Sequence, residues 1–407
     1  MCSLRFSFEE IDMETKLLVI GDNHIGKGTN LGKNIPGQHV GSRVQDQLDI
    51  LHWSLKQAVE NDCYGIVLTG DVFDSPSPTP ILINMFAEWC LDVVDHNMKL
   101  YIVAGNHDLY RTGDIYYSPL DIIEKLSNDI VVVKYNKTVV FPNEFGLTLM
   151  PFRDRKALNC KTTDEAVDLL RSQIKDSAAL IPRDCAKFLV GHLAIKGSVY
   201  YDEVKDMTNE LVLPVDAFSG YDQVMMGHIH KPQAMSNNVQ YIGSMDISDF
   251  GECDQKKKVI VFGATTFKEI ESPTRKLNKI EIMVPDGIDD PTKFVTAQIK
   301  KEKALGSSIT KVDISYESPD ANTVDRKKVE EFLLKSGVQH VAAILETKKK
   351  DIVKKDSLNL TTSISMDAAI NKYFETKIDN EEKRNRCISL SFELVKEFEQ
   401  VAEQKRH

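Results

Sequence analysis

The feature that most constrains this chain is a pattern repeated in its first 230 residues: a short apolar, β-prone run followed at once by a small polar cluster. Five runs show it, at residues 17–20, 66–68, 101–104, 188–190 and 224–226. Longer stretches with apolar residues at helical spacing lie between some of them, as at 43–60 and 79–97. Short apolar runs that alternate with helical patterns predict buried strands of an α/β fold.

The polar clusters combine Asp, Asn and His with a preceding glycine. They are Gly21-Asp22-Asn23-His24, Gly70-Asp71-Val72-Phe73-Asp74, Gly105-Asn106-His107-Asp108, Gly191-His192 and Gly227-His228-Ile229-His230. Ligands of open α/β sheets bind beyond the carboxyl ends of the strands, so we expect all five clusters at one edge of one sheet. We expect each glycine to let the backbone turn sharply before a ligand.

Such a set of side chains predicts a site for two metal ions. A two-metal hydrolase holds its ions roughly 3.5–4 Å apart and needs a bridging carboxylate with further nitrogen and neutral oxygen ligands. The clusters supply Asp22, His24, Asp71, Asn106, His192, His228 and His230. Mixed nitrogen and oxygen ligation suits manganese, iron or zinc better than calcium. A lone Gly-His pair would mean little, but five clusters in this order are specific.

Length and composition limit the alternatives. A chain of 407 residues is expected to form two or three units. The net charge of −10 argues against binding polyanions without regard to sequence. It does not exclude a nucleic-acid substrate, because bound metal ions neutralise the carboxylates that hold them. Seven scattered cysteines without a CxxC pair indicate reduced thiols and a cytoplasmic protein. Neither a signal peptide nor an apolar run of membrane-spanning length is present, so we expect no membrane association.

The chain is expected to divide at residues 14, 270 and 350. A short N-terminal extension, 1–14, precedes a catalytic domain at 15–270. Within that domain the later runs, at 131–133, 139–141, 147–150, 241–242 and 259–262, resemble the far half of a two-layered β core. A change of rhythm near Pro273 begins a small α+β unit, 271–350, with strands at 279–284, 312–316 and 338–346 and a helix at 324–336.

Three segments allow more than one interpretation. Residues 351–407 contain a linker and two helical patterns, and the second, 381–404, either packs on its own protein or docks on a partner. The helix at 79–97 carries an apolar set that either forms a homodimer face or is buried in the monomer; the set is Ile81, Leu82, Met85, Phe86 and Trp89. His39, in a Gly- and Asn-rich stretch at 25–42, is an exposed loop residue or an additional ligand, and we favour the former.

The order of the five clusters resembles that of the calcineurin-like metallophosphoesterases, over roughly residues 15–265. The resemblance implies a two-layered β core flanked by helices, an α/β/β/α sandwich. It implies a first ion held by Asp22, His24, Asp71 and His230. It implies a second ion held by Asp71, Asn106, His192 and His228, so that Asp71 bridges the pair. Mn²⁺ is the first candidate for both positions.

The same resemblance sets His107 apart as a catalytic residue. It would face the scissile phosphate and stabilise or protonate the leaving oxygen, a role that imidazole suits near neutral pH. Asp74 stands where a carboxylate of the family orients that histidine and fixes its tautomer. Asp108 is expected to support the turn. A metal-activated water would attack the phosphorus in line.

Finer features are similar to the SbcD-type nucleases, relatives of the eukaryotic meiotic-recombination nuclease. The segment 70–78 is similar to their second motif, and Tyr241-Ile242-Gly243-Ser244 with 256–259 to their post-catalytic segment. Ser75 and Pro76 replace the Arg-Gly of protein phosphatases. The resemblance implies DNA as substrate, a DNA-binding capping domain at 271–350, and an SbcC-like coiled-coil ATPase bound by 351–407.

Two other function classes remain open. One is a stand-alone phosphodiesterase or nucleotide pyrophosphatase, which has no need of the roughly 140 residues that follow the catalytic domain. The other is a catalytically idle scaffold, against which the complete ligand set and His107 count. The nuclease interpretation places the protein in recombination, repair or phage replication, associated with the nucleoid or, if phage-encoded, in the host cytoplasm.

Overall fold

The computed structural model describes residues 14–112, 115–200, 203–204, 210–302, 305–348, 373–374 and 381–404. The chain divides into two compact units. The first contains Met1–Val284, Ile288–Ile314 and Asn322–Glu346, and the second contains Pro285–Gly287, Ser315–Ala321 and Thr347–His407. Nearly all of the N-terminal extension and most of the first C-terminal helical pattern lie outside the described residues. The domain boundaries at 270 and 350 stay a prediction.

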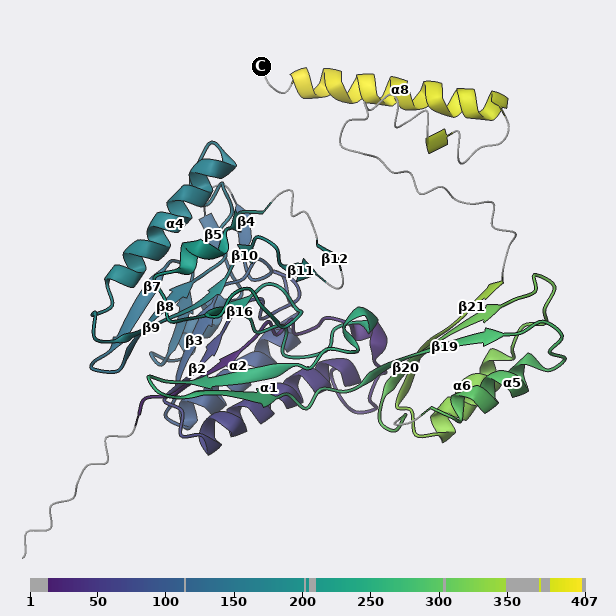
Figure 1. Cartoon of the computed structure of the whole chain (residues 1–407), viewed down its shortest axis with the longest axis horizontal. Helices are drawn as coiled ribbons and strands as arrows, with labels where there is room; N and C mark the ends of the chain where they lie inside the picture. The colour runs from purple at the N-terminus through teal and green to yellow at the C-terminus, as the bar shows by residue number, and fades with distance from the viewer. Residues whose placement is uncertain are drawn as a thin grey trace, which may run out of the picture. The chain divides into compact units, whose positions relative to one another are not determined.

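Two six-stranded sheets form the centre of the first unit (Figure 1). The first has the order β18 (Phe267–Glu271), β17 (Lys258–Phe262), β1 (Leu17–Ile20), β2 (Gly65–Leu68), β3 (Lys99–Val103), β6 (Ile130–Val133). The second has the order β15 (Gln233–Ala234), β16 (Val239–Tyr241), β14 (Gln223–Gly227), β9 (Ala186–His192), β8 (Phe145–Met150), β7 (Lys137–Phe141). The four strands β1, β2, β3 and β6 are parallel, as are β8, β9, β14 and β16.

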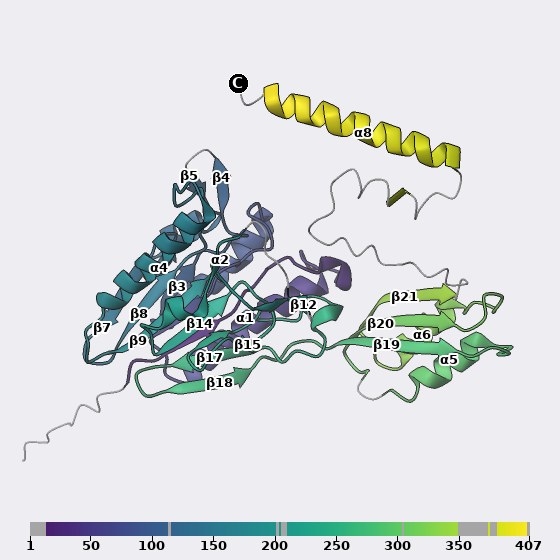
Figure 2. The same ribbon diagram turned by 45° about the horizontal axis from the view of Figure 1, so that its top comes forward.

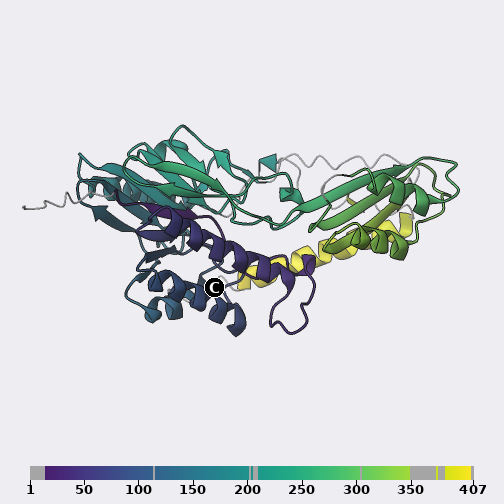
Figure 3. The same cartoon turned by 90° about the horizontal axis from the view of Figure 1, so that it is seen from below.

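The two sheets pack face to face through apolar side chains, and helices cover their outer faces. A buried cluster joins residues such as Val19 and Val67 of the first sheet to Leu147 and Phe188 of the second. Helices α1 (Ser42–Glu60) and α2 (Pro80–Asp95) pack on the first sheet, and α4 (Thr163–Ala179) packs on the second. In Figure 3 the purple helix α1 runs along one side of the strands. The predicted two-layered β core flanked by helices is therefore confirmed.

The expectation of one sheet edge is wrong. Strands β1, β2 and β3 belong to the first sheet, whereas β9 and β14, which carry the last two clusters, belong to the second. The runs at 131–133 and 259–262, assigned to the far layer, form β6 and β17 of the first sheet. An apolar run records that a strand is buried, but its hydrogen-bonding neighbour depends on tertiary packing.

Shorter elements complete the first unit. The strands are β4 (Tyr110–Thr112), β5 (Ile115–Tyr117), β10 (Ala194–Ile195), β11 (Val199–Tyr200), β12 (Glu203–Val204) and β13 (Val212–Leu213). The short helices are α3 (Leu120–Ile123) and the 3-10 turns Thr29–Leu31, Glu124–Leu126, Val215–Phe218 and Phe250–Glu252. Within the described ranges, no helix combines the length and the apolar composition needed to cross a bilayer.

The region after Pro273 forms a three-stranded sheet with two helices against it (Figure 2). Its strands are β19 (Leu277–Val284), β20 (Ile309–Tyr316) and β21 (His340–Lys348). Helix α6 (Arg326–Lys335) lies where the sequence predicts it, whereas α5 (Pro291–Ile299) was not predicted. Helix α8 spans Glu381–Gln404, the second predicted C-terminal pattern.

Helix α2 buries much of the apolar set proposed for a dimer face. Phe86 and Trp89 are fully buried, and the Trp89 indole N–H donates to the Leu51 carbonyl oxygen at 2.9 Å. Ile81 remains 43% exposed. Burial in the monomer therefore accounts for the two aromatic rings, and homodimer formation stays a prediction.

Candidate metal centre

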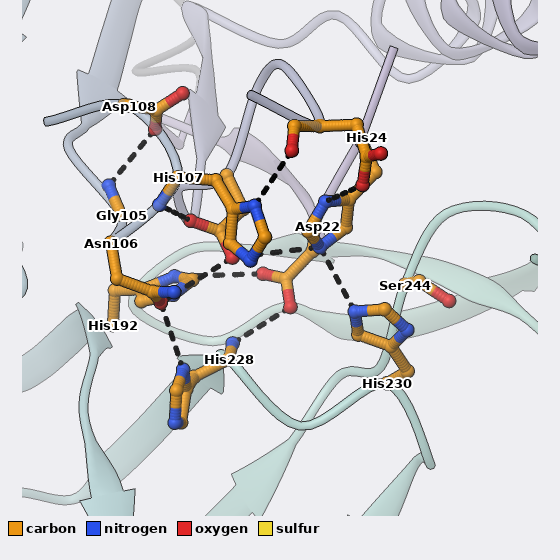
Figure 4. Close-up of polar contacts among 12 residues, drawn as sticks. Asp22, His24, Gly105, Asn106, His107, Asp108, His192, His228, His230 and Ser244 are labelled. Atoms are coloured by element: carbon orange, nitrogen blue, oxygen red, sulfur yellow. Dashed lines mark hydrogen bonds and ion pairs between the residues drawn. The ribbon is translucent and has the colours of Figure 1, made fainter. Parts of the chain in front are cut away.

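Side chains of the five polar clusters meet at the carboxyl ends of strands from both sheets. Figure 4 labels residues of the first, third, fourth and fifth clusters. Asp22, Asp71 and Asn106 follow β1, β2 and β3, respectively. His192 is the last residue of β9 and lies opposite Gly227, the last residue of β14. The sandwich thus brings together from two layers the side chains that the sequence predicts at a single edge.

Asp22 lies between two groups of potential ligands. It lies close to His24 and His230 in one group, and to Asp71 and His192 in the other, with ligand atoms in each group within 4.8 Å of one another. Its carboxylate accepts from the His228 backbone N–H at 2.8 Å and from the Thr69 hydroxyl at 3.1 Å. These bonds fix the orientation of a fully buried carboxylate.

Asp71 also spans both groups. Its Oδ2 lies 3.5 Å from His24 Nε2 and 3.4 Å from His192 Nε2. Burial raises the pKa of Asp71, but the neighbouring His192 and His24 outweigh it and hold that pKa well below its ordinary value. Conversely, burial lowers the pKa of His192, while Asp71 and Asp22 raise it, to about 9. The centre is therefore built from strongly interacting anionic and imidazole groups.

Asn106 completes a second ligand set. Its Oδ1 lies 3.0 Å from His192 Nε2 and 3.1 Å from His228 Nδ1. On the other side of the centre, His24 Nε2 lies 2.9 Å from His230 Nε2, so two imidazole nitrogens face each other. Burial lowers the pKa of His24, which favours the neutral, ligating form of its ring.

Each of the four imidazole rings has one nitrogen that faces the other potential ligands and one that points away from them. An oxygen atom lies near the second nitrogen in every ring. His192 Nδ1 contacts the Thr69 carbonyl at 3.0 Å, and His24 Nδ1 lies 3.3 Å from Asp74 Oδ1. Glu252 and Glu210 contact His230 Nδ1 and His228 Nε2, respectively. Hydrogen-bonding partners of this kind fix the tautomer and orientation of metal-binding histidines. His192, His228 and His230 have such partners. Among the described residues, His24 Nδ1 makes no hydrogen bond and meets Asp74 at ion-pair distance alone. The donor set thus fits two divalent transition-metal ions, with mixed nitrogen and oxygen ligation.

The sequence does not predict Thr69, Glu210 or Glu252 as residues of the site. Thr69 lies directly after β2, one residue before the second cluster. Glu252 lies between Tyr241-Ile242-Gly243-Ser244 and residues 256–259, the two parts of the segment that is similar to the post-catalytic segment of the nucleases. Glu210 shows no pattern of its own in the sequence.

His107 lies beside the ligand sets. Its backbone N–H donates to Asp71 Oδ1 at 2.8 Å, and its Nδ1 lies 2.8 Å from the backbone carbonyl oxygen of Asp74. Its ring meets the His24 ring edge to face, with centroids 4.9 Å apart. The Asp74 carboxylate lies against His24, so the main-chain oxygen of Asp74, rather than the expected carboxylate, is the contact of His107. Ligand atoms of His24, Asp74 and His107 form a third close group.

Asp108 supports the turn that carries Asn106 and His107. Its carboxylate accepts from the backbone N–H groups of Gly105 and Val72, each at 2.9 Å. Burial and the charge of Asp71 raise the pKa of Asp108 to about 7.

Three of the motif glycines, Gly70, Gly105 and Gly227, make room for predicted ligands. A Cβ on Gly105 would lie 2.1 Å from Asp71 Oδ1, and one on Gly227 would lie 2.3 Å from Asp22 Oδ1. Among the cluster glycines only Gly70 has a positive φ, of 119°. Instead, three predicted ligands adopt the left-handed conformation: His24, Asp71 and His228, with φ of 45°, 48° and 88°. Strain of this kind is typical of functional sites.

His39 is exposed and belongs to none of the close groups of potential ligands found in the described residues. The six cysteines that the structure describes are free thiols.

Residues 15–232, just over half of the chain, match the model of the calcineurin-like phosphoesterase family. The chain belongs to this family, and its fold and buried donor set are those of a metal-dependent phosphoesterase.

Curated relatives carry more particular names. The chain is 25% identical to the SbcD subunit of the nuclease SbcCD of Staphylococcus saprophyticus, over 66% of this chain and 71% of that protein. It is 25% identical to the SbcD subunit of the nuclease SbcCD of Escherichia coli K12, over 60% of this chain and 65% of that protein. It is 24% identical to the DNA double-strand break repair protein Mre11 of Methanosarcina acetivorans, over 86% of this chain and 52% of that protein.

Proposed function

We propose that this protein is a dinuclear metal-dependent DNA nuclease, with exonuclease activity, single-strand endonuclease activity or both, and the nuclease subunit of an SbcCD-like complex. The observation that carries the proposal is the meeting of two ligand sets around Asp22 and Asp71, with His107 beside them. The relatives are named as nuclease subunits and as a DNA double-strand break repair protein, which supports DNA as the substrate.

The two ions would be held as the family resemblance implies. Asp22, His24, Asp71 and His230 would hold the first, and Asp71, Asn106, His192 and His228 the second. When bound, two divalent ions, with Mn²⁺ expected, lower the pKa of water and neutralise the nonbridging oxygens of a phosphodiester. Asp71 can serve both ions because its carboxylate lies within 3.5 Å of an imidazole nitrogen from each set.

His107 would serve the leaving group. Its Nδ1–H donates to the Asp74 carbonyl, which leaves Nε2 to face the substrate. A proton on Nε2 would pass to the departing oxygen as the phosphorus–oxygen bond breaks. His107 and Asp74 are therefore the proposed catalytic pair, with Asp74 acting as a positioning residue through its main-chain oxygen.

The remaining regions are assigned by position. Residues 271–350 would form the DNA-binding capping domain, and 351–407, which include α8, would bind an SbcC-like coiled-coil ATPase. A homodimer through α2 is a further expectation. The free thiols suit a cytoplasmic protein, and a DNA substrate would place it at the nucleoid or, for a phage protein, in the host cytoplasm.

The first test is nuclease activity on end-labelled linear duplex DNA and on circular single strands, with Mn²⁺ and with a chelator. We expect degradation that requires the metal. His107→Ala should lower the rate by about 10²–10⁴-fold, as expected for loss of a general acid. Metal content, measured by mass spectrometry, should stay unchanged.

The matched control is His39→Ala, which removes an exposed loop imidazole and should leave both activity and metal content unchanged. Hydrolysis of cyclic nucleotides without activity on any DNA would contradict the nuclease proposal. That result would favour a stand-alone phosphodiesterase.

A further inference from the structure

Two glutamates stand behind the two histidines of the segment Gly227-His228-Ile229-His230. Glu252 Oε1 lies 2.9 Å from His230 Nδ1, and Glu210 Oε2 lies 2.8 Å from His228 Nε2. In each ring the opposite nitrogen faces the metal centre: His230 Nε2 faces His24, and His228 Nδ1 faces Asn106.

Glu252 is buried, and both of its carboxylate oxygens have partners. The residue is 1% exposed, and its Oε2 lies 3.0 Å from both Lys257 Nζ and the backbone N–H of Ser248. Lys257 is itself 1% exposed and donates to the His230 carbonyl oxygen at 2.8 Å. His230, Glu252 and Lys257 thus form a closed ring of contacts, in which a buried ammonium balances the carboxylate.

Glu210 is held more simply. Its side chain is 33% exposed, and its carboxylate pairs with His228. It lies two residues before β13 and more than forty residues before Glu252 in the sequence. The two glutamates therefore reach the centre from different parts of the chain, and a change at one need not disturb the other.

We propose that Glu252 and Glu210 are positioning residues that serve one metal ion each, Glu252 through His230 and Glu210 through His228. This inference rests on the proposed ligand assignment, in which His230 binds the first ion and His228 the second. A carboxylate behind a metal-binding imidazole fixes its tautomer and makes the ligating nitrogen more basic. Loss of such a partner typically lowers metal affinity by about 10–100-fold.

The test is a titration of the full-length, metal-stripped protein with MnCl₂, in which electron paramagnetic resonance measures free Mn²⁺. The wild type should bind two ions. Glu252→Gln and Glu210→Gln preserve side-chain size and remove the charge. Each should weaken one ion by about 10–100-fold and leave the affinity for the other unchanged.

Double variants identify which ion each glutamate serves. Adding Glu252→Gln to His230→Ala should have little further effect, because both changes act on the same ion. Adding it to His228→Ala should weaken the remaining ion as much as it does in the wild type. Glu210→Gln should show the reverse dependence, since coupling is expected only between residues that act together.

Two controls separate positioning from general damage. Glu269→Gln removes a carboxylate that pairs with Lys258 rather than with an imidazole, and should leave both ions unaffected. Glu252→Gln leaves Lys257 buried without its anion, so the double variant Glu252→Gln/Lys257→Met is made as well. The double variant should show a cooperative thermal melting curve, as a folded protein does, and should still bind the first ion weakly.

Equal weakening of both ions by either glutamine variant, or unchanged affinity for both, would overturn the inference. A wild-type protein that binds two ions in that same experiment would leave the proposed function standing. A wild type that binds fewer than two ions would contradict the dinuclear assignment itself.

Discussion

At the scale of single residues, Asp71 is the side chain on which both halves of the metal centre depend. Its carboxylate lies within 3.5 Å of a ring nitrogen of both His24 and His192, and it accepts a hydrogen bond from the backbone N–H of His107. Asp71→Asn should therefore weaken both ions and lower activity by about 100-fold or more. Asn106→Ala, which removes a contact with His192 and His228 only, should spare the first ion. Metal analysis of both purified variants checks this, and equal metal content in Asp71→Asn and the wild type would contradict the bridging role.

The residues predicted from the sequence were those in short, ordered clusters. Asp22 and Asp71 each follow an apolar run, and His192 was predicted because the five clusters occur together and in order. Glu210 and Glu252 lie 18 and 22 residues from the imidazoles that they contact, in stretches without periodicity. Tertiary structure creates contacts of that kind, and no local sequence pattern predicts them.

At the scale of elements, the strands were predictable but their sheet was not. The run 17–20 forms β1 as predicted, whereas the runs that form β6 and β17 join a different layer from the expected one. Helix α5 was missed although a start signal precedes it: Asp290 caps the Lys293 N–H, and Pro291 is its first residue. Its nine residues are too few to show a clear helical period beside the longer patterns.

Gly227, at the end of β14, joins the second sheet to the ligands of the first. Gly227→Ala would place a methyl group 2.3 Å from Asp22 Oδ1 and 2.4 Å from Thr69 Oγ1. Displacement of Asp22 should lower Mn²⁺ affinity by at least about tenfold, with about 1–3 kcal/mol of destabilisation from overpacking. Gly306→Ala is the control, since its Cβ would meet nothing within 4 Å. A titration with Mn²⁺ measures the affinity. Unchanged affinity in Gly227→Ala would contradict a requirement for the close approach of residue 227 to Asp22.

At the scale of the whole molecule, one carboxylate connects distant parts of the sequence within the first unit. Asp46 of α1 binds the guanidinium groups of both Arg43 and Arg275. Arg43, 1% exposed, also pairs with Asp246, which lies in the segment between Ser244 and Glu252. Ion pairs thereby join residues of α1 to residues that lie far later in the sequence, 229 positions later for Arg275.

Asp46→Asn should destabilise the fold by about 1–3 kcal/mol, because two guanidinium groups lose the charge of a buried carboxylate while Arg43 keeps Asp246. Urea unfolding of the purified variant measures the change. Asp49→Asn is the control on the same helix, because that carboxylate is exposed and accepts a hydrogen bond from the Gln45 amide. Equal unfolding midpoints for Asp46→Asn and Asp49→Asn would contradict a structural role for this network.

We expect the two sheets together to hold two metal ions that share Asp71. Anomalous diffraction at the manganese edge, from crystals grown with Mn²⁺, tests it most directly. Two peaks roughly 3.5–4 Å apart are expected, one among Asp22, His24 and His230 and the other among Asn106, His192 and His228, with Asp71 beside both. A single peak, or two peaks without Asp71 between them, would contradict a dinuclear centre bridged by Asp71.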